Sequence, residues 1–392
     1  YDIASCLVGS EMCIRDSNHF DFGYPALMMG MDIQTADFAC KNSGYNWFQN
    51  WESFNQCNPQ GRPTSMMWYH IYKNLKVAND VIATIDPETE NAQLKFYLAQ
   101  GLAMRAFDYF NLAQTYQFTY VGNESKPCVP IITDVNAAEA GANGCARATV
   151  QEVYDQIMLD LNTAITLFEG TNLTPAQVID SKPKRMIDIA VAYGLRARVN
   201  LVMNKWTDAA NDAQKAIQLF AGAPYSRAAV SVPAFSNIED NSWMWGIAVA
   251  ETDRVVTTGI CNFPSFMGTF TGNGYSNYGA WKWCGKVLYD AIPSTDVRKG
   301  WFINEEYTSP NLDAQMQAYI NKYVNNDKLT YGADNSNYIM PYTQVKFAPY
   351  NNVVGGTTNA CDIPLMRVEE MYYIYACLLY TSPSPRDKRQ YR

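Results

Sequence analysis

Two aromatic clusters contain the residue types that suit binding of a flat, polar ligand. Residues 45–51 read YNWFQNW, and the glycine-rich residues 272–285 hold two Tyr and two Trp. Aromatic rings stack on the flat apolar faces of sugar rings, while Asn and Gln offer donors and acceptors to hydroxyl groups. Glycines leave room for a ligand near the backbone. We therefore expect a neutral oligosaccharide to contact Trp47, Trp51, Asn46, Asn50, Tyr275, Tyr278, Trp281 and Trp283.

A second interpretation of the same clusters is open, namely that their rings pack the loops against the rest of the protein. Aromatic side chains that fall at helical spacing belong to a different group, because one helix face is normally buried. Core positions are expected for Trp68, Tyr72, Tyr109, Phe110 and Tyr154.

The composition excludes some classes of partner. The chain has 392 residues, 48% of them hydrophobic, and a formal net charge of -8 with a pI of about 4.9. A nucleic-acid-binding protein normally shows a basic face, and the body of this chain has no run of Lys and Arg. No apolar stretch is long enough to form a transmembrane helix. An acidic protein with a neutral partner fits these numbers.

Neither metal chemistry nor covalent catalysis has a recognisable motif here. The chain has two His and ten Cys, with no C-x-x-C pair and no H-E-x-x-H, G-x-S-x-G or phosphate-binding loop. We therefore expect no catalytic residues, no metal and no cofactor. A glycoside hydrolase stays a remote alternative, since its two carboxylates could lie anywhere among 38 Asp and Glu. Cys128 and Cys145 flank one loop, and both pairing and free thiols are open.

Helical periodicity dominates the first half of the chain. Apolar residues recur at spacings of three and four, and Thr149 with Glu152 forms the sequence signature of a capping box. The pattern predicts helices over residues 64–85, 92–116, 149–170, 186–203 and 206–220, with another over 366–376.

An internal repeat points to stacked helix pairs. Residues 164–168 (AITLF) match residues 216–220 (AIQLF), as in tetratricopeptide-like arrays with irregular spacing. Arg105 and Arg196 occupy equivalent positions, each on the second helix of a pair. A carboxylate partner between helices is the favoured interpretation for both, and an anion-binding site is the alternative.

The predicted fold is mainly α, a tetratricopeptide-like scaffold of helix pairs with an irregular, loop-rich lobe. Residues 221–359 are rich in Gly, Asn, Pro and Tyr, and so long a stretch of loops is expected to carry function. The predicted division is an N-terminal loop region over 18–63, the scaffold over 64–220, the ligand-binding lobe over 221–359 and a last scaffold helix over 360–376.

The two ends differ from the rest. Residues 1–17 and 377–392 lack periodicity and resemble translated adapter sequence, so we expect them to be non-native. Cys6 follows a lipobox-like Ile-Ala-Ser but has no apolar segment before it, and it is not expected to be an anchor. The native ends, with any export signal, are expected to be missing.

Several strings in order resemble the SusD/RagB family of outer-membrane nutrient-binding lipoproteins. They extend from about residue 68 to 376, and no single string is diagnostic. Gln100-Gly101 departs from the family's usual Glu-Ala. The matching strings are 68–74 (WYHIYKN), 105–112 (RAFDYFNL), 147–154 (RATVQEVY), 241–246 (NSWMWG), 296–298 (DVR) and 363–369 (IPLMRVE).

The resemblance implies four helix pairs beside an irregular lobe, and a non-enzymatic protein that is lipid-anchored at the cell surface. It implies binding of an oligosaccharide or polysaccharide and delivery to a SusC-like TonB-dependent transporter. Membrane contact would come only from a lipid on the missing N-terminus. A peptide-binding lipoprotein of a RagB-like complex and a tetratricopeptide-type interaction module are the alternatives.

Overall fold

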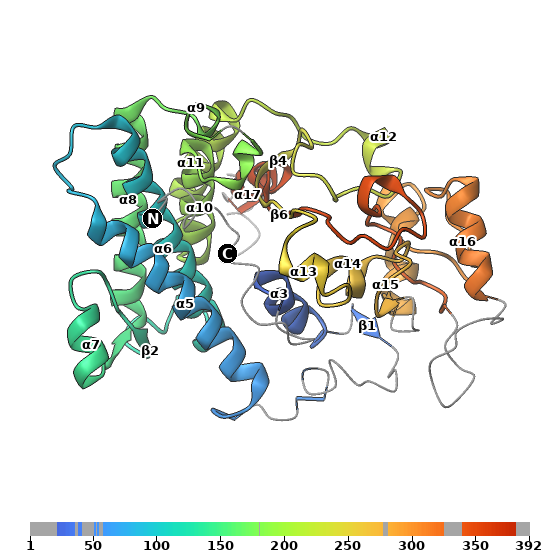
Figure 1. Cartoon of the computed structure of the whole chain (residues 1–392), viewed down its shortest axis with the longest axis horizontal. Helices are drawn as coiled ribbons and strands as arrows, with labels where there is room; N and C mark the ends of the chain where they lie inside the picture. Colours follow the sequence, from blue (N-terminus) through green and yellow to red (C-terminus); the bar gives the residue numbers. More distant parts are fainter. Residues whose placement is uncertain are drawn as a thin grey trace, which may run out of the picture.

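The computed structural model describes residues 22–35, 38–40, 51, 53–54, 58–179, 181–276, 281–324 and 339–381. Within these residues the protein has a helical half and a loop-rich half, which lie side by side in Figure 1. The mainly α fold predicted from the sequence is confirmed.

Six long helices build the helical half, with α6 at its centre. Helix α6 packs between α5 and α8, α10 packs on α8 and α11, and α11 packs on α17. Most of α6 is buried from Phe96 to Ala113. The six are α5 (Arg62–Thr84), α6 (Ala92–Tyr116), α8 (Val150–Thr171), α10 (Ile189–Val202), α11 (Trp206–Leu219) and α17 (Val368–Thr381).

Side-chain caps fix where these helices begin. Thr149 accepts from the backbone N–H of Glu152, whose carboxylate accepts from the N–H of Thr149, so the predicted capping box is confirmed. Asn91 caps α6 by accepting from the N–H groups of residues 93 and 94. Asp188 accepts from the N–H of Val191 at the start of α10.

The departure at Gln100-Gly101 has a physical explanation. The Gln100 amide donates to the carbonyl of Ile187 and accepts from the N–H of the same residue, which ties α6 to the segment before α10. A Cβ at Gly101 would lie 2.9 Å from Cγ1 of Ile82, closer than real side chains allow. Glycine at this position lets α5 and α6 approach.

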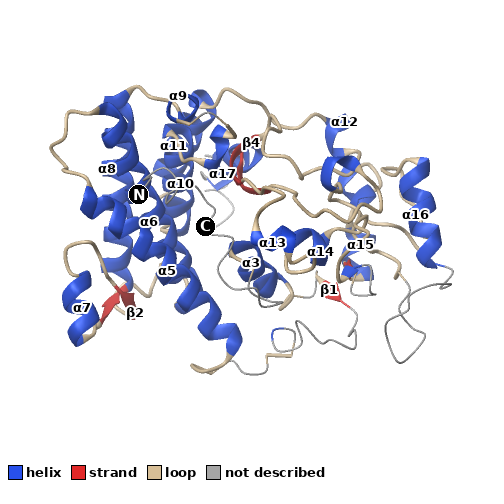
Figure 2. Ribbon diagram, viewed as in Figure 1, coloured by secondary structure: helices blue, strands red, loops and turns tan. Residues whose placement is uncertain are grey.

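The second half holds short elements joined by loops (Figure 2). Three antiparallel pairs occur in the described chain: β1 with β5, β2 with β3, and β4 with β6. The lobe elements are α12 (Arg227–Val230), β4 (Trp243–Ile247), α13 (Arg254–Thr257), α14 (Phe263–Met267), β5 (Lys282–Trp283), α15 (Lys286–Ala291), η3 (Val297–Trp301), α16 (Ala314–Val324), η4 (Tyr350–Asn352) and β6 (Ile363–Arg367).

The remaining elements border the helices. Helix α3 lies between the two halves in Figure 1. Helices α3, α7 and α16 were not individually predicted from the sequence. Helix α16 buries Met316, Ile320 and Tyr323 at helical spacing, but polar residues stand between these positions in the sequence. These further elements are α3 (Tyr24–Asp32), β1 (Ala39–Cys40), β2 (Pro127–Pro130), α7 (Ala137–Asn143), β3 (Arg147–Thr149), α9 (Pro175–Val178) and η1 (Pro183–Arg185).

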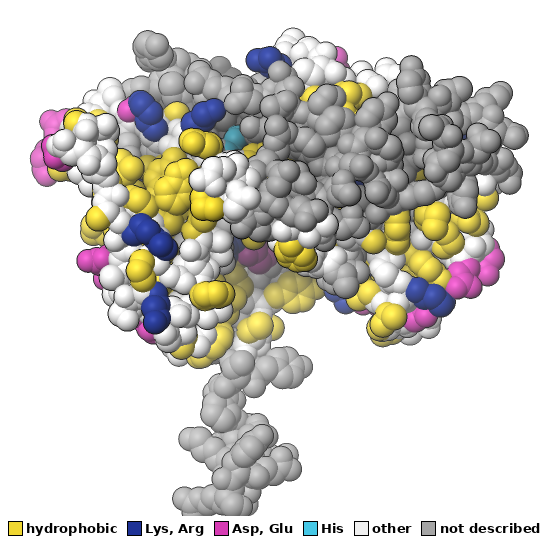
Figure 3. Space-filling model, turned by 90° about the horizontal axis from the view of Figure 1, so that it is seen from below, with side chains coloured by type: hydrophobic (Ala, Val, Ile, Leu, Met, Phe, Trp, Pro, Cys, Tyr) yellow, Lys and Arg dark blue, Asp and Glu magenta, His cyan; other side chains and the backbone are white. Residues whose placement is uncertain are grey.

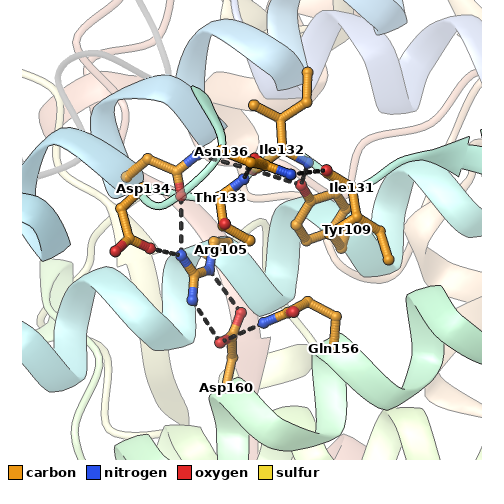
Figure 4. Close-up of polar contacts among 10 residues, drawn as sticks. Arg105, Tyr109, Ile131, Ile132, Thr133, Asp134, Asn136, Gln156 and Asp160 are labelled. Carbon is orange, nitrogen blue, oxygen red and sulfur yellow. Dashed lines mark hydrogen bonds and ion pairs between the residues drawn. The ribbon is translucent and has the colours of Figure 1, made fainter. Parts of the chain in front are cut away.

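A buried ion pair joins α6 to α8 (Figure 4). Arg105 donates from Nε and from a terminal nitrogen to the two oxygens of Asp160, both at 2.8 Å. Its other terminal nitrogen donates to Asp134 at 2.7 Å and to Asn79 of α5 at 3.0 Å. The predicted carboxylate partner is confirmed, and the guanidinium ties α5, α6, α8 and one loop together.

Arg196, which occupies the equivalent position in another helix pair, also forms an ion pair with a carboxylate. Arg196 of α10 donates to both oxygens of Asp212 on α11, at 2.9 and 2.7 Å. Asn200 also donates to Asp212. The paired carboxylate predicted for Arg196 is therefore confirmed, and neither arginine is free to serve as an anion site.

We expect Arg105→Ala to lower the free energy of unfolding by about 3–5 kcal/mol, because the variant leaves the buried Asp160 carboxylate without its partner. Urea unfolding followed by circular dichroism measures this change. The matched control is Lys76→Ala, which breaks an exposed i,i+4 pair with Asp80 and should cost about 0–1 kcal/mol. Equal effects of the two variants would contradict a central role for Arg105.

Asp108 is a buried acid at the boundary between the two halves. It lies on α6 with 2% of its surface exposed, and its Oδ2 has no hydrogen-bond partner among the described residues. Burial raises the pKa of its carboxyl well above the usual 3.8. The proton therefore stays on the folded protein at a pH where the unfolded chain has already lost it.

The sign of the pH dependence follows from this shift. The free energy of unfolding should fall as the pH rises from about 4 through the folded-state pKa of Asp108, because the folded state holds more protons over that range. Asp108→Asn is neutral at every pH and should be more stable than the parent at pH 7 but similar at pH 4. Urea midpoints at pH 4, 5, 6 and 7 measure this; a constant difference across the series would argue against a protonated Asp108.

Candidate ligand-binding surface

The pairing of β1 with β5 joins residues 39–40 to the second predicted aromatic segment. Ala39 lies opposite Trp283 and Cys40 opposite Lys282. The chain leaves β1 directly into residues 41–50, which include the predicted ligand contacts Asn46, Trp47 and Asn50 and lie outside the described residues.

Trp51 is a packing residue in this structure. Only 3% of its surface is exposed, and it belongs to the main hydrophobic core. A Cβ at Gly30 of α3 would lie 2.6 Å from the indole Nε1, so the ring fills the space that this glycine leaves. Its burial favours the packing interpretation over stacking on a ligand.

The side chain of Tyr275 is also buried against other aromatic rings. It is 4% exposed and stacks on Phe266 with ring centroids 4.6 Å apart. Phe266 in turn stacks on Phe22 at 5.3 Å, which makes a column of three rings. The packing interpretation is favoured for Tyr275, while Tyr278 lies outside the described residues.

Trp283 of β5 and Trp281, which precedes this strand, have different environments. Trp281 is 2% exposed and packs in the lobe's own core with its ring 5.4 Å from that of Tyr323. Trp283 is half-buried, held by its pairing with Ala39 on one side and a bridge to Thr343 on the other. Among the candidates that the structure describes, Trp283 is the one with accessible surface.

Helix α15 extends this surface with residues that the sequence reasoning missed. Val287 is 85% exposed, and the ring of Tyr289 lies 4.8 Å from that of Tyr342. Figure 3 shows hydrophobic side chains at the end of the lobe that carries α15 and α16. The short run KVLYDA after Gly285 was the available signal, but six residues are too few for a periodicity argument.

A polar triad borders these rings. Lys286 donates to Glu305 at 2.8 Å and to the Tyr342 hydroxyl at 3.2 Å, and that hydroxyl donates to Glu305 at 2.5 Å. The hydrogen bond from Lys286 lowers the pKa of Glu305, and the hydrogen bond to Glu305 raises the pKa of Tyr342. The surface therefore presents aromatic edges together with fixed donors and acceptors, which is what recognition of hydroxyl groups needs.

The described residues hold no cluster of His, Cys, Asp and Glu that could bind a metal ion. Cys128 and Cys145 are free thiols, so the disulfide left open by the sequence is absent between these two residues. None of the described helices combines the length and the apolar character that crossing a bilayer requires.

The chain is similar to known proteins in sequence over part of its length. A family model described as SusD-like, "Starch-binding associating with outer membrane", matches residues 28–201. No curated protein matches the chain significantly.

The fold is similar to solved structures over nearly the whole chain. A SusD-like carbohydrate-binding protein from Bacteroides vulgatus has a TM-score of 0.70 and 22% identity, covering 96% of this chain and 70% of that one. Surface glycan-binding protein A from Bacteroides thetaiotaomicron, solved with laminarihexaose, has a TM-score of 0.64 and 16% identity, covering 99% and 80%. A laminarin-binding SusD-like protein has a TM-score of 0.64 and 18% identity, covering 98% and 81%.

The two neighbouring tryptophans should respond differently to truncation. We expect Trp281→Ala to cost about 3–5 kcal/mol of unfolding free energy, because it empties a buried site. Trp283→Ala should cost less than about 2 kcal/mol, since its ring is half-exposed. Urea unfolding of both variants tests this, and an equal cost would show that Trp283 is a core residue too.

Proposed function

We propose that this chain is a SusD-like protein and that it binds a glycan on the surface formed by β5 and α15. The observation that supports the proposal is the partial exposure of Trp283, which is held by pairing with Ala39 and a bridge to Thr343. The partly exposed indole offers a stacking face, and the neighbouring triad offers hydrogen bonds.

The comparisons support a glycan as the ligand class. Two structural neighbours are named for binding laminarin or laminarihexaose, and the family model is described as starch-binding. The predicted contacts Asn46, Trp47, Asn50 and Tyr278 remain part of this proposal. Trp283 is the first residue to test, because its position is described and its ring is accessible.

Binding without catalysis is the proposed activity. Glycoside hydrolysis needs two carboxylates facing each other across a cleft. At the proposed surface, Glu305 is exposed and engaged by Lys286, and Asp290 lies 3.3 Å from the same ammonium. Both carboxylates therefore act as partners of a lysine, and the structural neighbours are named as binding proteins.

The setting of this activity is the cell surface. We propose that the mature protein is lipid-anchored at the outer membrane and delivers its glycan to a SusC-like TonB-dependent transporter. The family description, with its association to the outer membrane, supports the location. Co-purification of the native protein with such a transporter would test the partnership.

We expect isothermal titration against a panel of neutral soluble polysaccharides to identify a polysaccharide that the protein binds. Trp283→Ala should weaken that binding about threefold to tenfold, the range for loss of one ring contact, while the variant stays folded. Phe118→Ala is the matched control, because Phe118 is an exposed aromatic on the helical half. Binding of a peptide pool in place of every glycan would refute the proposal in favour of peptide capture.

A further inference from the structure

Two cations in the lobe are surrounded by aromatic rings. The Lys346 ammonium lies 4.8, 5.0 and 5.1 Å from the ring centroids of Phe235, Trp301 and Phe347. The guanidinium carbon of Arg367 lies 4.8 Å from the centroid of Phe235. Both side chains are partly open to solvent, that of Arg367 by 30%.

Neither cation has a carboxylate oxygen within hydrogen-bond distance, unlike Arg105, Arg196 and Arg198. The Lys346 ammonium has no hydrogen bond or ion pair with any described residue. The nearest carboxylate oxygen to Arg367 is Oε2 of Glu369 at 3.8 Å, while the other oxygen of Glu369 accepts from the N–H of Tyr225. In contrast, bidentate carboxylates at 2.6–2.9 Å engage Arg105, Arg196 and Arg198.

The rings around these cations are fixed by the fold. The Trp301 indole donates to the carbonyl of Val230 at 2.8 Å. The backbone N–H of Ala234 donates to the carbonyl of Lys346 at 2.9 Å, which joins the two chain segments. Phe235 has a φ of +61°, a left-handed conformation that costs a bulky side chain energy and persists only where the surroundings enforce it.

A pocket adjoins the same rings. It is a narrow crevice, and Phe235 and Phe347 form part of its wall together with Phe263 and Tyr350. Phe263 meets Phe347 edge to face at 5.2 Å. Four of its thirteen lining residues are aromatic, and their rings give the crevice an apolar surface suited to the flat face of a sugar ring.

The two positive charges oppose each other. Burial and, to a smaller extent, the charge of Arg367 lower the pKa of Lys346 to about 8, while the charge of Asp32 acts in the opposite direction. A carboxylate or sulfate from outside would offset this repulsion and satisfy guanidinium N–H donors that have no close carboxylate partner.

We propose that Lys346 and Arg367 bind the anionic group of a carboxylated or sulfated sugar, whose apolar ring face packs against the aromatic rings beside these cations. This inference rests on the proposed glycan binding and adds a class of ligand to it. It also assigns a second contact region, distinct from the surface at Trp283.

The test compares ligands that differ in charge alone. A uronate oligosaccharide is titrated beside its methyl ester, and a sulfated oligosaccharide beside its desulfated form. We expect at least one anionic member to bind about tenfold more tightly than its neutral counterpart, with the advantage decreasing as salt is added. Preference for the uronate pair or the sulfated pair tells the two sources of charge apart.

Substitutions locate the site. Lys346→Gln and Arg367→Gln should each remove most of the preference for the anionic form and leave binding of the neutral form unchanged. Lys322→Gln is the matched control, because Lys322 also lies over aromatic rings, those of Tyr319 and Tyr323, on another part of the lobe. It should have no effect.

A measurement on the unaltered protein covers the case in which a variant fails to fold. Acetylation of Lys346, followed by mass spectrometry, should be suppressed by the anionic oligosaccharide and not by its neutral counterpart. Equal affinity for charged and neutral members, or unchanged acetylation of Lys346, would overturn this inference. If a neutral glycan still binds in a manner that depends on Trp283, the proposed function stands; if no glycan binds, both fail.

Discussion

The ion pair between Arg105 and Asp160 is the constraint on which the helical half depends. Its guanidinium lies inside the protein and joins α6 to α8 directly, to α5 through Asn79, and to the 131–136 loop through Asp134. Moving one of these helices would leave a charge buried without its partner, a cost of several kcal/mol. Hydrophobic packing alone tolerates sliding between helices, whereas a bidentate pair fixes their register.

The lobe is attached to this scaffold by a second set of oriented contacts. Arg198 of α10 donates to both oxygens of Glu370 on α17 and to the carbonyl of Leu365 on β6. Since β6 pairs with β4, this arginine fixes a sheet of the lobe against the helices. The Asp362 carboxylate accepts hydrogen bonds from the Lys182 ammonium and from the backbone N–H groups of Ile238 and Val249. Several lobe segments are therefore held by one carboxylate. These contacts hold the long loops of the lobe in fixed positions.

Helices and their ion pairs could be predicted from the sequence, whereas the roles of single aromatic residues could not. Periodicity and capping motifs are local, so the starts of α6, α8 and α10 follow from nearby residues. Burial of Trp51 depends on a glycine in α3, and burial of Trp281 on residues of α16 far along the chain. Local composition is the same for Trp281 and Trp283, and only their partners from distant segments separate their environments, Tyr323 for Trp281 and Ala39 and Thr343 for Trp283.

The same dependence on distant contacts distinguishes Lys346 and Arg367 from Arg105 and Arg196. Arg105 and Arg196 stand in helical repeats, so their spacing suggested a carboxylate on the neighbouring helix. Lys346 and Arg367 meet because a bridge between residues 234 and 347 and the β4–β6 pair bring three chain segments together. Arg105, Arg196 and Arg198 are neutralised at close range, whereas these two cations lie against aromatic rings. The two proposed contact regions therefore differ in chemistry, with ring stacking at Trp283 and charge at Lys346, and both belong to the lobe.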